Sequence, residues 1–137
     1  MPKFIDNNQW VELPLQSIYK LFVAQPGLFP GMEARVTPIT LEDGTVITAE
    51  SAAQGLLTIG VQDHLDAQAK LSGYDSIHTA AIRAGYPGPY QFEGIKFATW
   101  MDNVWVFCYA VLANVQAGTR SIPSLAELIA ELPVLPA

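Results

Sequence analysis

The fold is decided by one long apolar stretch, YQFEGIKFATWMDNVWVFCYAVLANVQA, which runs from Tyr90 to Ala117. Apolar residues recur in it at spacings of three and four, as on one face of a helix: Phe97, Trp100, Val104, Cys108, Val111 and Val115. A neighbouring stripe, formed by Trp105, Tyr109 and Leu112, makes the apolar arc wide. A helix that is apolar nearly all round is normally buried on more than one side, so in a short chain this pattern predicts contact with a partner.

Start and stop signals around this stretch predict further helices. The starts are capping boxes at Ser51–Gln54 and Ser124–Glu127 and a capping aspartate at Asp75. The predicted helices run from Ser51 to Ser72, from Ser76 to Ala84, from Tyr90 to Ala117 and from Leu125 to Leu132. Gly73 and Gly118 follow two of them as C-terminal caps. Short loops favour antiparallel neighbours, so the helices are expected to form a small bundle.

Two glycines, Gly55 and Gly60, interrupt the first of these helices. A glycine inside a helix costs about 1 kcal/mol relative to alanine. The pair therefore predicts either a close approach by another element or a break near Leu57 to Ile59.

A β-hairpin is predicted before the bundle. Its strands are Val36–Leu41 and Thr45–Thr48, both rich in β-branched residues, and Asp43-Gly44 in the turn tolerates positive φ. Pro38 cannot donate to a strand ladder, which indicates an edge strand. An isolated hairpin is marginal in water, so it must pack on the helices or on another chain.

The segment before the hairpin is apolar yet punctuated by proline and glycine. Four prolines in residues 1–34 argue against long regular structure. We expect an extended, partner-binding N-terminal arm, with a short helix from Leu15 to Ala24 as an alternative. The predicted fold class is α+β, mainly α: a small helical bundle (residues 50–137) with an extended arm (1–34) and one β-hairpin (35–49).

Composition narrows the class of protein. Half of the 137 residues are hydrophobic and 15% are charged, against roughly 25% in average soluble domains, which excludes a disordered chain. The net charge of -6 makes nucleic acid an unsuitable partner, because an acidic chain repels phosphates. A single cysteine, Cys108, excludes a disulfide within the chain and a cysteine-based zinc finger.

Targeting and membrane signals are weak. The N-terminus has no basic region followed by an apolar run, so no secretory signal is expected. The stretch from Phe97 to Val115 approaches the length of a membrane span but contains Asp102, Asn103 and Asn114, which favours a buried or interface helix. We expect no membrane span and a chain made in the cytoplasm of its cell.

Candidate chemistry is sparse. Asp63, His64 and Asp66 lie together, and His78 lies on another predicted helix. These side chains would form a divalent metal site if they met, but their spacing matches no metal motif, and a solvated helix face is the favoured interpretation. Cys108 lies between Phe107 and Tyr109, which favours a buried, inert thiol. No catalytic motif is found, so we expect no catalytic residue, metal or cofactor.

The segment from Gly73 to Pro133 resembles tail proteins of tailed bacteriophages and prophages. The resemblance covers about 45% of the chain and is carried by the following runs: Gly73–Ile77, Ala84–Tyr90, Glu93–Asp102, Cys108-Tyr109, Val115–Gly118 and Leu128–Pro133. Relatives of this kind are described as tail fibre or tail fibre assembly proteins. The resemblance implies a structural or assembly role without chemistry.

The function expected from these observations is therefore protein–protein association in a phage particle. The first choice is a tail or tail-fibre component in the virion, made in the host cytoplasm and contacting other tail or fibre proteins within a homo-oligomer or symmetric assembly. The alternatives are an assembly chaperone absent from the mature particle, a capsid or tail decoration protein, and a small metal-dependent enzyme. The predicted interface residues are Trp10, Leu13, Phe22, Phe29, Val36, Ile39, Leu41, Val46, Ile47, Trp105 and Tyr109.

Overall fold

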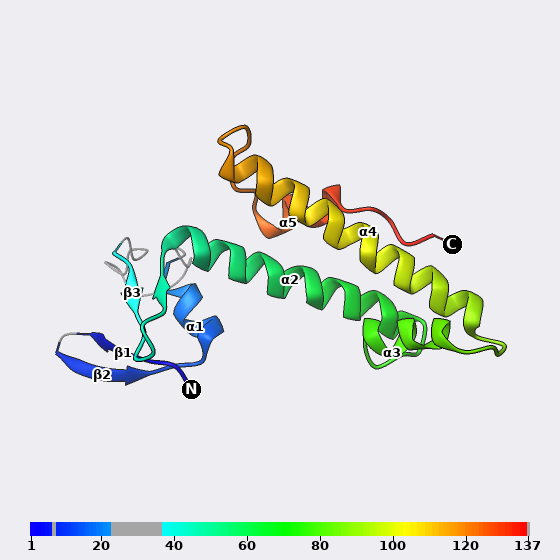
Figure 1. Cartoon of the computed structure of the whole chain (residues 1–137), viewed down its shortest axis with the longest axis horizontal. Helices are drawn as coiled ribbons and strands as arrows, with labels where there is room; N and C mark the ends of the chain where they lie inside the picture. Colours follow the sequence, from blue (N-terminus) through cyan, green and yellow to red (C-terminus); the bar gives the residue numbers. More distant parts are fainter. Residues whose placement is uncertain (7, 23–36, 137) are drawn as a thin grey trace. The chain divides into compact units, whose positions relative to one another are not determined.

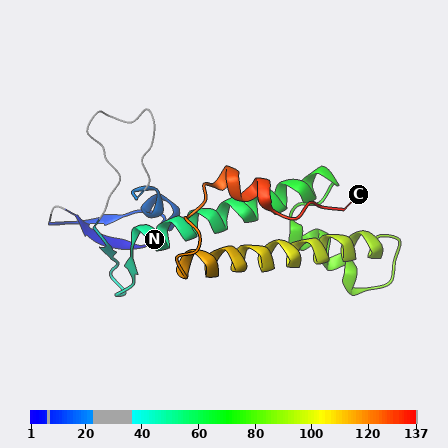
Figure 2. The ribbon, with the colours of Figure 1, turned by 90° about the horizontal axis from the view of Figure 1, so that it is seen from above.

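The computed structural model describes residues 1–6, 8–22 and 37–136, and the chain divides into two compact units, Met1–Ile59 and Gly60–Ala137. The described residues form five α-helices, one 3-10 helix and two two-stranded antiparallel sheets (Figures 1 and 2). The predicted fold class, α+β and mainly α, is confirmed. Phe29, Val36 and the last part of the predicted arm lie outside the described residues.

The first 22 residues contain regular structure in place of the expected extended arm. Strands β1 (Lys3–Asp6) and β2 (Gln9–Glu12) pair as a hairpin, and helix α1 (Leu15–Lys20) follows. Asn8 has a φ of 62° in the turn, a conformation that asparagine tolerates better than most residues. The structure thus has two hairpins where one was predicted, and α1 is a shorter form of the alternative helix.

The predicted hairpin is present, with shorter strands. Strands β3 (Ile39–Thr40) and β4 (Val46–Ile47) are antiparallel, and Gly44 has a φ of 90° in the turn. The Asp43 carboxylate accepts a 2.9 Å hydrogen bond from the Thr45 N–H, which holds the pKa of that carboxyl below its usual value. This bond explains why Asp-Gly directs the turn.

The two hairpins share one core. Phe4 on β1 forms a β-bridge with Leu41, and the Glu42 N–H donates a 2.8 Å hydrogen bond to the Lys3 carbonyl. The buried members of this core are Phe4, Ile18, Phe22, Ile39, Leu41, Ile47 and Ala52. The first unit therefore covers much of its apolar surface by itself.

Helix α2 (Ala49–Leu71) begins two residues before its predicted start. The predicted capping box at Ser51–Gln54 is therefore wrong. The Thr48 N–H donates to Ser51 Oγ (2.8 Å), and the Ser51 N–H donates to Thr48 Oγ1 (3.2 Å). This reciprocal pair makes Thr48 the cap. At the other end Gly73 has a φ of 91°, and Tyr74 N–H donates to the Ala69 carbonyl, as in a Schellman motif.

The two glycines of α2 serve close approaches, and the helix is continuous through them. The Tyr19 ring lies where a side chain on Gly55 would be, within the first unit. The Leu125 side chain occupies the same place at Gly60, within the second unit. Of the two alternatives left by the sequence, close approach is confirmed and a break is not observed.

The predicted helix from Ser76 to Ala84 is two pieces, α3 (Ile77–Ala81) and the 3-10 helix η1 (Ile82–Gly85). Its cap is Ser76, not Asp75, because Ser76 Oγ accepts a 3.2 Å hydrogen bond from the Thr79 N–H. Both pieces pack against α4 (Gln91–Gln116), at one end of that helix (Figure 1).

Helix α4 is the centre of the second unit. Its buried residues are Gly94, Phe97, Trp100, Val104 and Val111, which lie on the predicted face. Trp100 Nε1 donates a 2.7 Å hydrogen bond to the Pro133 carbonyl, and this bond fixes the segment after the last helix. The helix ends one residue before its predicted end, and Gly118 follows with a φ of 78°.

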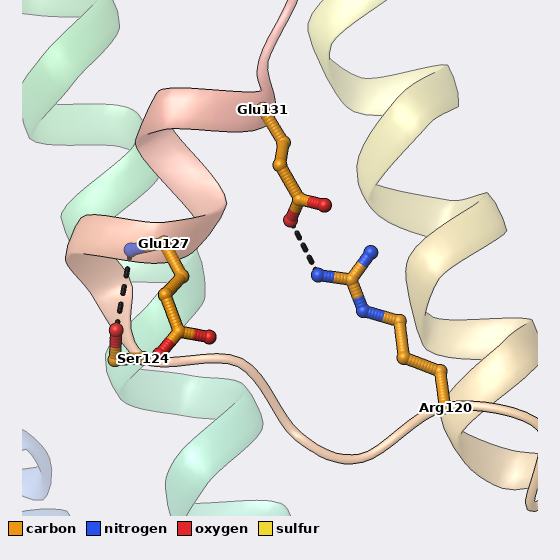
Figure 3. A network of polar contacts seen from close by, with 4 residues as sticks. All are labelled: Arg120, Ser124, Glu127 and Glu131. Atoms are coloured by element: carbon orange, nitrogen blue, oxygen red, sulfur yellow. Dashed lines mark hydrogen bonds and ion pairs between the residues drawn. The ribbon is translucent and has the colours of Figure 1, made fainter.

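Helix α5 (Leu125–Glu131) begins where the sequence predicts (Figure 3). Ser124 Oγ accepts a 3.2 Å hydrogen bond from the Glu127 N–H, which confirms the second capping box. Arg120, in the loop before the helix, forms an ion pair with Glu131 in its last turn. Leu128 and Leu132 are buried, so α5 covers part of the second core.

Close packing of η1 on α4 leaves no room for a side chain at Gly94. A Cβ there would lie 2.7 Å from the carbonyl carbon of Arg83. Alanine favours a helix by about 1 kcal/mol over glycine, but displacing a packed backbone costs about 1–3 kcal/mol. The two terms leave a net loss of about 0–2 kcal/mol, and we expect Gly94→Ala to lower the free energy of unfolding by about 1 kcal/mol in urea denaturation.

Gly85→Ala is the matched control, because a Cβ on Gly85 meets nothing within 4 Å. That variant is expected to be neutral or more stable by up to about 1 kcal/mol. Equal free energies of unfolding for the two variants would contradict the close contact between η1 and α4.

Candidate interaction surface

Several predicted interface residues belong to the core of the first unit. Phe22, Ile39, Leu41 and Ile47 are buried there, and Leu13 is half-buried against the same core. Alternation along β3 and β4 turns Ile39 and Ile47 inward and leaves Thr40 and Val46 exposed. Contacts with another chain are therefore left to residues that remain exposed.

The exposed residues among the predictions are Trp10, Val46 and Tyr109, while Trp105 is half-buried. Trp10 is 61% exposed on β2 and lies directly across from Ile5 on β1, which is also exposed. Direct cross-strand partners share one face of a sheet, so these two side chains form a small apolar pair. The sequence identified Trp10 but not its partner, because the first hairpin was not predicted.

A larger apolar surface lies on α4, opposite its buried side. Phe92 is 88% exposed, Val106 and Tyr109 are each 68% exposed, and Ile95 is exposed as well. Between them lie Thr99, Asp102, Asn103, Ala110 and Ala113, all exposed. We call these nine residues, Phe92, Ile95, Thr99, Asp102, Asn103, Val106, Tyr109, Ala110 and Ala113, the outer face of α4.

The outer face follows from the helical repeat. Its members recur at intervals of three, four and seven residues, so they line one side of the helix over its length. Asp102 is its one charged residue. Sequence reasoning selected only Tyr109 from this face and missed Phe92, Ile95 and Val106. The helical spacing of these three residues with Tyr109 would have indicated that they share one side of the helix.

A third exposed group surrounds the turn before α4. Tyr86 and Tyr90 are exposed, and Arg83 joins them: its Nη1 donates a 2.6 Å hydrogen bond to the Tyr86 hydroxyl, and its guanidinium lies 5.7 Å from the Tyr90 ring centre. A cation over an aromatic ring is attracted by the ring's electron-rich face. Arg83 therefore orders the two tyrosines.

Two side chains of the metal hypothesis, Asp66 and His64, have other contacts. Asp66 Oδ1 accepts hydrogen bonds from the Ile77 N–H (3.0 Å) and from Gln62 Nε2 (3.2 Å), so Asp66 ties α2 to the start of α3. The His64 ring meets Trp100 edge-on, with centroids 6.0 Å apart, whereas His78 is exposed on α3. Across residues 1–6, 8–22 and 37–136, no group of three or more metal-ligating side chains is positioned to hold an ion.

Cys108 is half-buried on α4, at helical spacing from the buried residues Val104 and Val111. Burial raises the pKa of the Cys108 thiol, because a thiolate is disfavoured away from water. A thiol of this kind is a weak nucleophile near neutral pH. Its environment resembles that of a packing residue more than that of a reactive one.

Comparison of the chain with family models, with curated proteins and with solved structures finds no match. Within the part of the chain that the structure describes, no helix is both long and apolar enough to cross a membrane. The surfaces described above are therefore the observations on which a function can be argued.

The role of Asp66 can be tested by substitution. Removing its carboxylate leaves the Ile77 N–H without its acceptor, so Asp66→Ala is expected to lower the free energy of unfolding by about 1–2 kcal/mol. Asp66→Asn keeps a side-chain oxygen and should lose less. Thermal and urea denaturation measure the difference.

Asp63→Ala is the control for this series, because Asp63 is exposed on the same helix. Surface substitutions of this kind usually change stability by less than about 0.5 kcal/mol. If Asp66→Ala were as stable as Asp63→Ala, the assignment of Asp66 as the link between α2 and α3 would be wrong.

Proposed function

We propose that the protein is a non-enzymatic structural protein of a tailed bacteriophage, a tail or tail-fibre component of the virion that acts through protein–protein contacts. The observation that carries the proposal is the outer face of α4, where Phe92, Val106 and Tyr109 are largely exposed. Single exposed apolar residues are ordinary, but several large ones on one side of a helix, with one charged residue among nine, are typical of an interaction site. The partners are other tail or fibre proteins, and the location is the virion tail.

The resemblance of Gly73–Pro133 to phage tail proteins supports the same role. This segment contains α3, η1, α4 and α5, which are most of the second unit. Both ends of this segment coincide with features of the fold. Gly73 ends α2, and the Pro133 carbonyl accepts the hydrogen bond from Trp100. The resembling residues therefore belong to one folded body with its own core.

The low charge of the chain fits an assembly part. Only 15% of residues are charged, and the apolar Ile5–Trp10 pair of the first unit is exposed in addition to the outer face of α4. Permanent interfaces are more apolar than transient ones and resemble a divided domain core. A subunit repeated around a symmetry axis buries such surfaces against its neighbours.

The rivals differ in where the protein is found. An assembly chaperone would use the same apolar surfaces and then leave, whereas a decoration protein would stay on the capsid or tail. A metal-dependent enzyme has the least support, because Asp66 already accepts two hydrogen bonds and His78 is an exposed residue of a separate helix, α3.

The test is the protein composition of purified phage particles from the phage or prophage that encodes this chain. We expect quantitative mass spectrometry to find the chain in fixed stoichiometry to the other tail proteins, and in isolated tails as well as in whole particles. Presence in the infected-cell lysate with absence from particles would overturn the proposal in favour of a chaperone. Presence on tail-less capsids would favour a decoration protein.

A further inference from the structure

We propose that Arg83, together with the hydroxyl of Tyr86, binds a carboxylate of a partner protein, from an aspartate or glutamate side chain in an exposed segment of that protein. The site lies beside the turn between η1 and α4 and does not use the outer face of α4. It is carried by a guanidinium that its own unit holds in place but leaves without a carboxylate. The inference goes beyond the proposed function, because it assigns a class of ligand to residues that the proposed function does not use.

Arg83 is fixed in place before any ligand arrives. Its backbone packs closely on α4, where a Cβ on Gly94 would lie 2.7 Å from the Arg83 carbonyl carbon. Its side chain is held by the 2.6 Å hydrogen bond from Nη1 to the Tyr86 hydroxyl and by the Tyr90 ring, whose centre lies 5.7 Å from the guanidinium carbon. An arginine that is ordered in advance loses less conformational entropy on binding.

The charge of Arg83 has no partner within the part of the chain that the structure describes. Arg120, the other arginine of the second unit, forms an ion pair with Glu131, whereas no described carboxylate lies within ion-pair distance of Arg83. Glu93 accepts its hydrogen bond from the Tyr74 hydroxyl instead. Arg83 is half-buried, and its Nε–H, which is buried, meets no acceptor among the described residues. Charges removed from water are normally paired and hydrogen-bonded, so this guanidinium is prepared for an anion from outside.

The donors at this point suit a carboxylate. A guanidinium carries several N–H donors in one plane and no acceptor, and one of its N–H groups reaches Tyr86. The Tyr86 oxygen accepts that hydrogen bond, so the proton of the same hydroxyl is available for donation. Tyr86 is 46% exposed, which leaves the hydroxyl within reach of another molecule. A carboxylate only accepts hydrogen bonds, and it can receive an N–H and an O–H from this pair at once.

The surroundings favour a single carboxylate on a protein over a polyanion. Nucleic acids are bound by several cations along the phosphate backbone, whereas this chain has 7 basic and 13 acidic residues and repels a polyanion. The exposed rings of Tyr86 and Tyr90 lie beside the guanidinium and offer apolar contact area around it. Arginine and tyrosine are the residues most often found where a few side chains carry most of the affinity of a protein–protein contact.

Nuclear magnetic resonance titration of the isotope-labelled full chain tests the site. The probes are acetyl-Gly-Glu-Gly-amide and, as the matched neutral control, acetyl-Gly-Gln-Gly-amide, both at constant ionic strength. We expect only the glutamyl peptide to shift the Nε–H signal of Arg83 and the backbone amide signals of Tyr86 and Tyr90, and to do so saturably.

Three variants assign this binding to its donors. Arg83→Gln should weaken binding of the glutamyl peptide at least about tenfold, because a hydrogen bond to a charged group is lost. Tyr86→Phe removes only the hydroxyl and should weaken binding about three- to tenfold. Lys70→Gln makes the same change of charge at an exposed residue of α2 and should change the affinity by less than about twofold.

Equal shifts with the two peptides would overturn the inference, and so would binding that survives Arg83→Gln. Inorganic phosphate is a third probe, and saturation by phosphate without binding of the glutamyl peptide would overturn the carboxylate in favour of a phosphate ligand. Circular dichroism checks the helicity of each variant. If Arg83→Gln disturbs the helices, Tyr86→Phe decides, and an unchanged affinity in that variant would refute the site. These measurements use the purified chain, so their outcome is independent of whether the chain is found in phage particles.

Discussion

A helix that is apolar around most of its circumference can be covered by its own unit on only part of it. This constraint governs α4, whose Phe97, Trp100 and Val104 are buried while Phe92 and Val106 remain exposed. Burial of each large apolar side chain contributes about 1.5–3 kcal/mol, so the covered side stabilises the unit and the uncovered side supplies affinity for another surface. The buried side of α4 thus stabilises the fold, and the exposed side of the same helix provides the proposed interaction surface.

The buried side of α4 is held by a few close contacts with neighbouring segments. Gly94 lets η1 lie against α4, the Tyr74 hydroxyl reaches Glu93 (3.1 Å), and the Trp100 indole holds the Pro133 carbonyl. These contacts fix which arc of α4 faces inward. The outward arc, with one charged residue in nine, follows from that orientation. The first unit has a core of its own.

Local signals in the sequence predicted the local structure well. Ser124 and Glu127 form their capping box, Gly73 and Gly118 end their helices with positive φ, and Asp43-Gly44 makes the turn. Where two neighbouring residues could each cap a helix, a contact from a residue distant in the sequence decides which one does. Asp75 and Ser76 are both capping residues, and Asp66, from α2, selects the register by accepting from the Ile77 N–H. For the same reason, no pattern within α4 alone could show which part of its apolar arc is covered.

The proposed function requires that another chain buries the outer face of α4 in solution. Sedimentation equilibrium of the full chain over a wide concentration range tests this most directly, with Val106→Asp as the altered face and Thr58→Asp, exposed on α2, as the matched control. The weight-average mass is expected to rise from the 14.9 kDa of one chain towards twice that value for the unaltered chain and for Thr58→Asp, but not for Val106→Asp. A mass that stays at one chain for all three proteins at every concentration would contradict it.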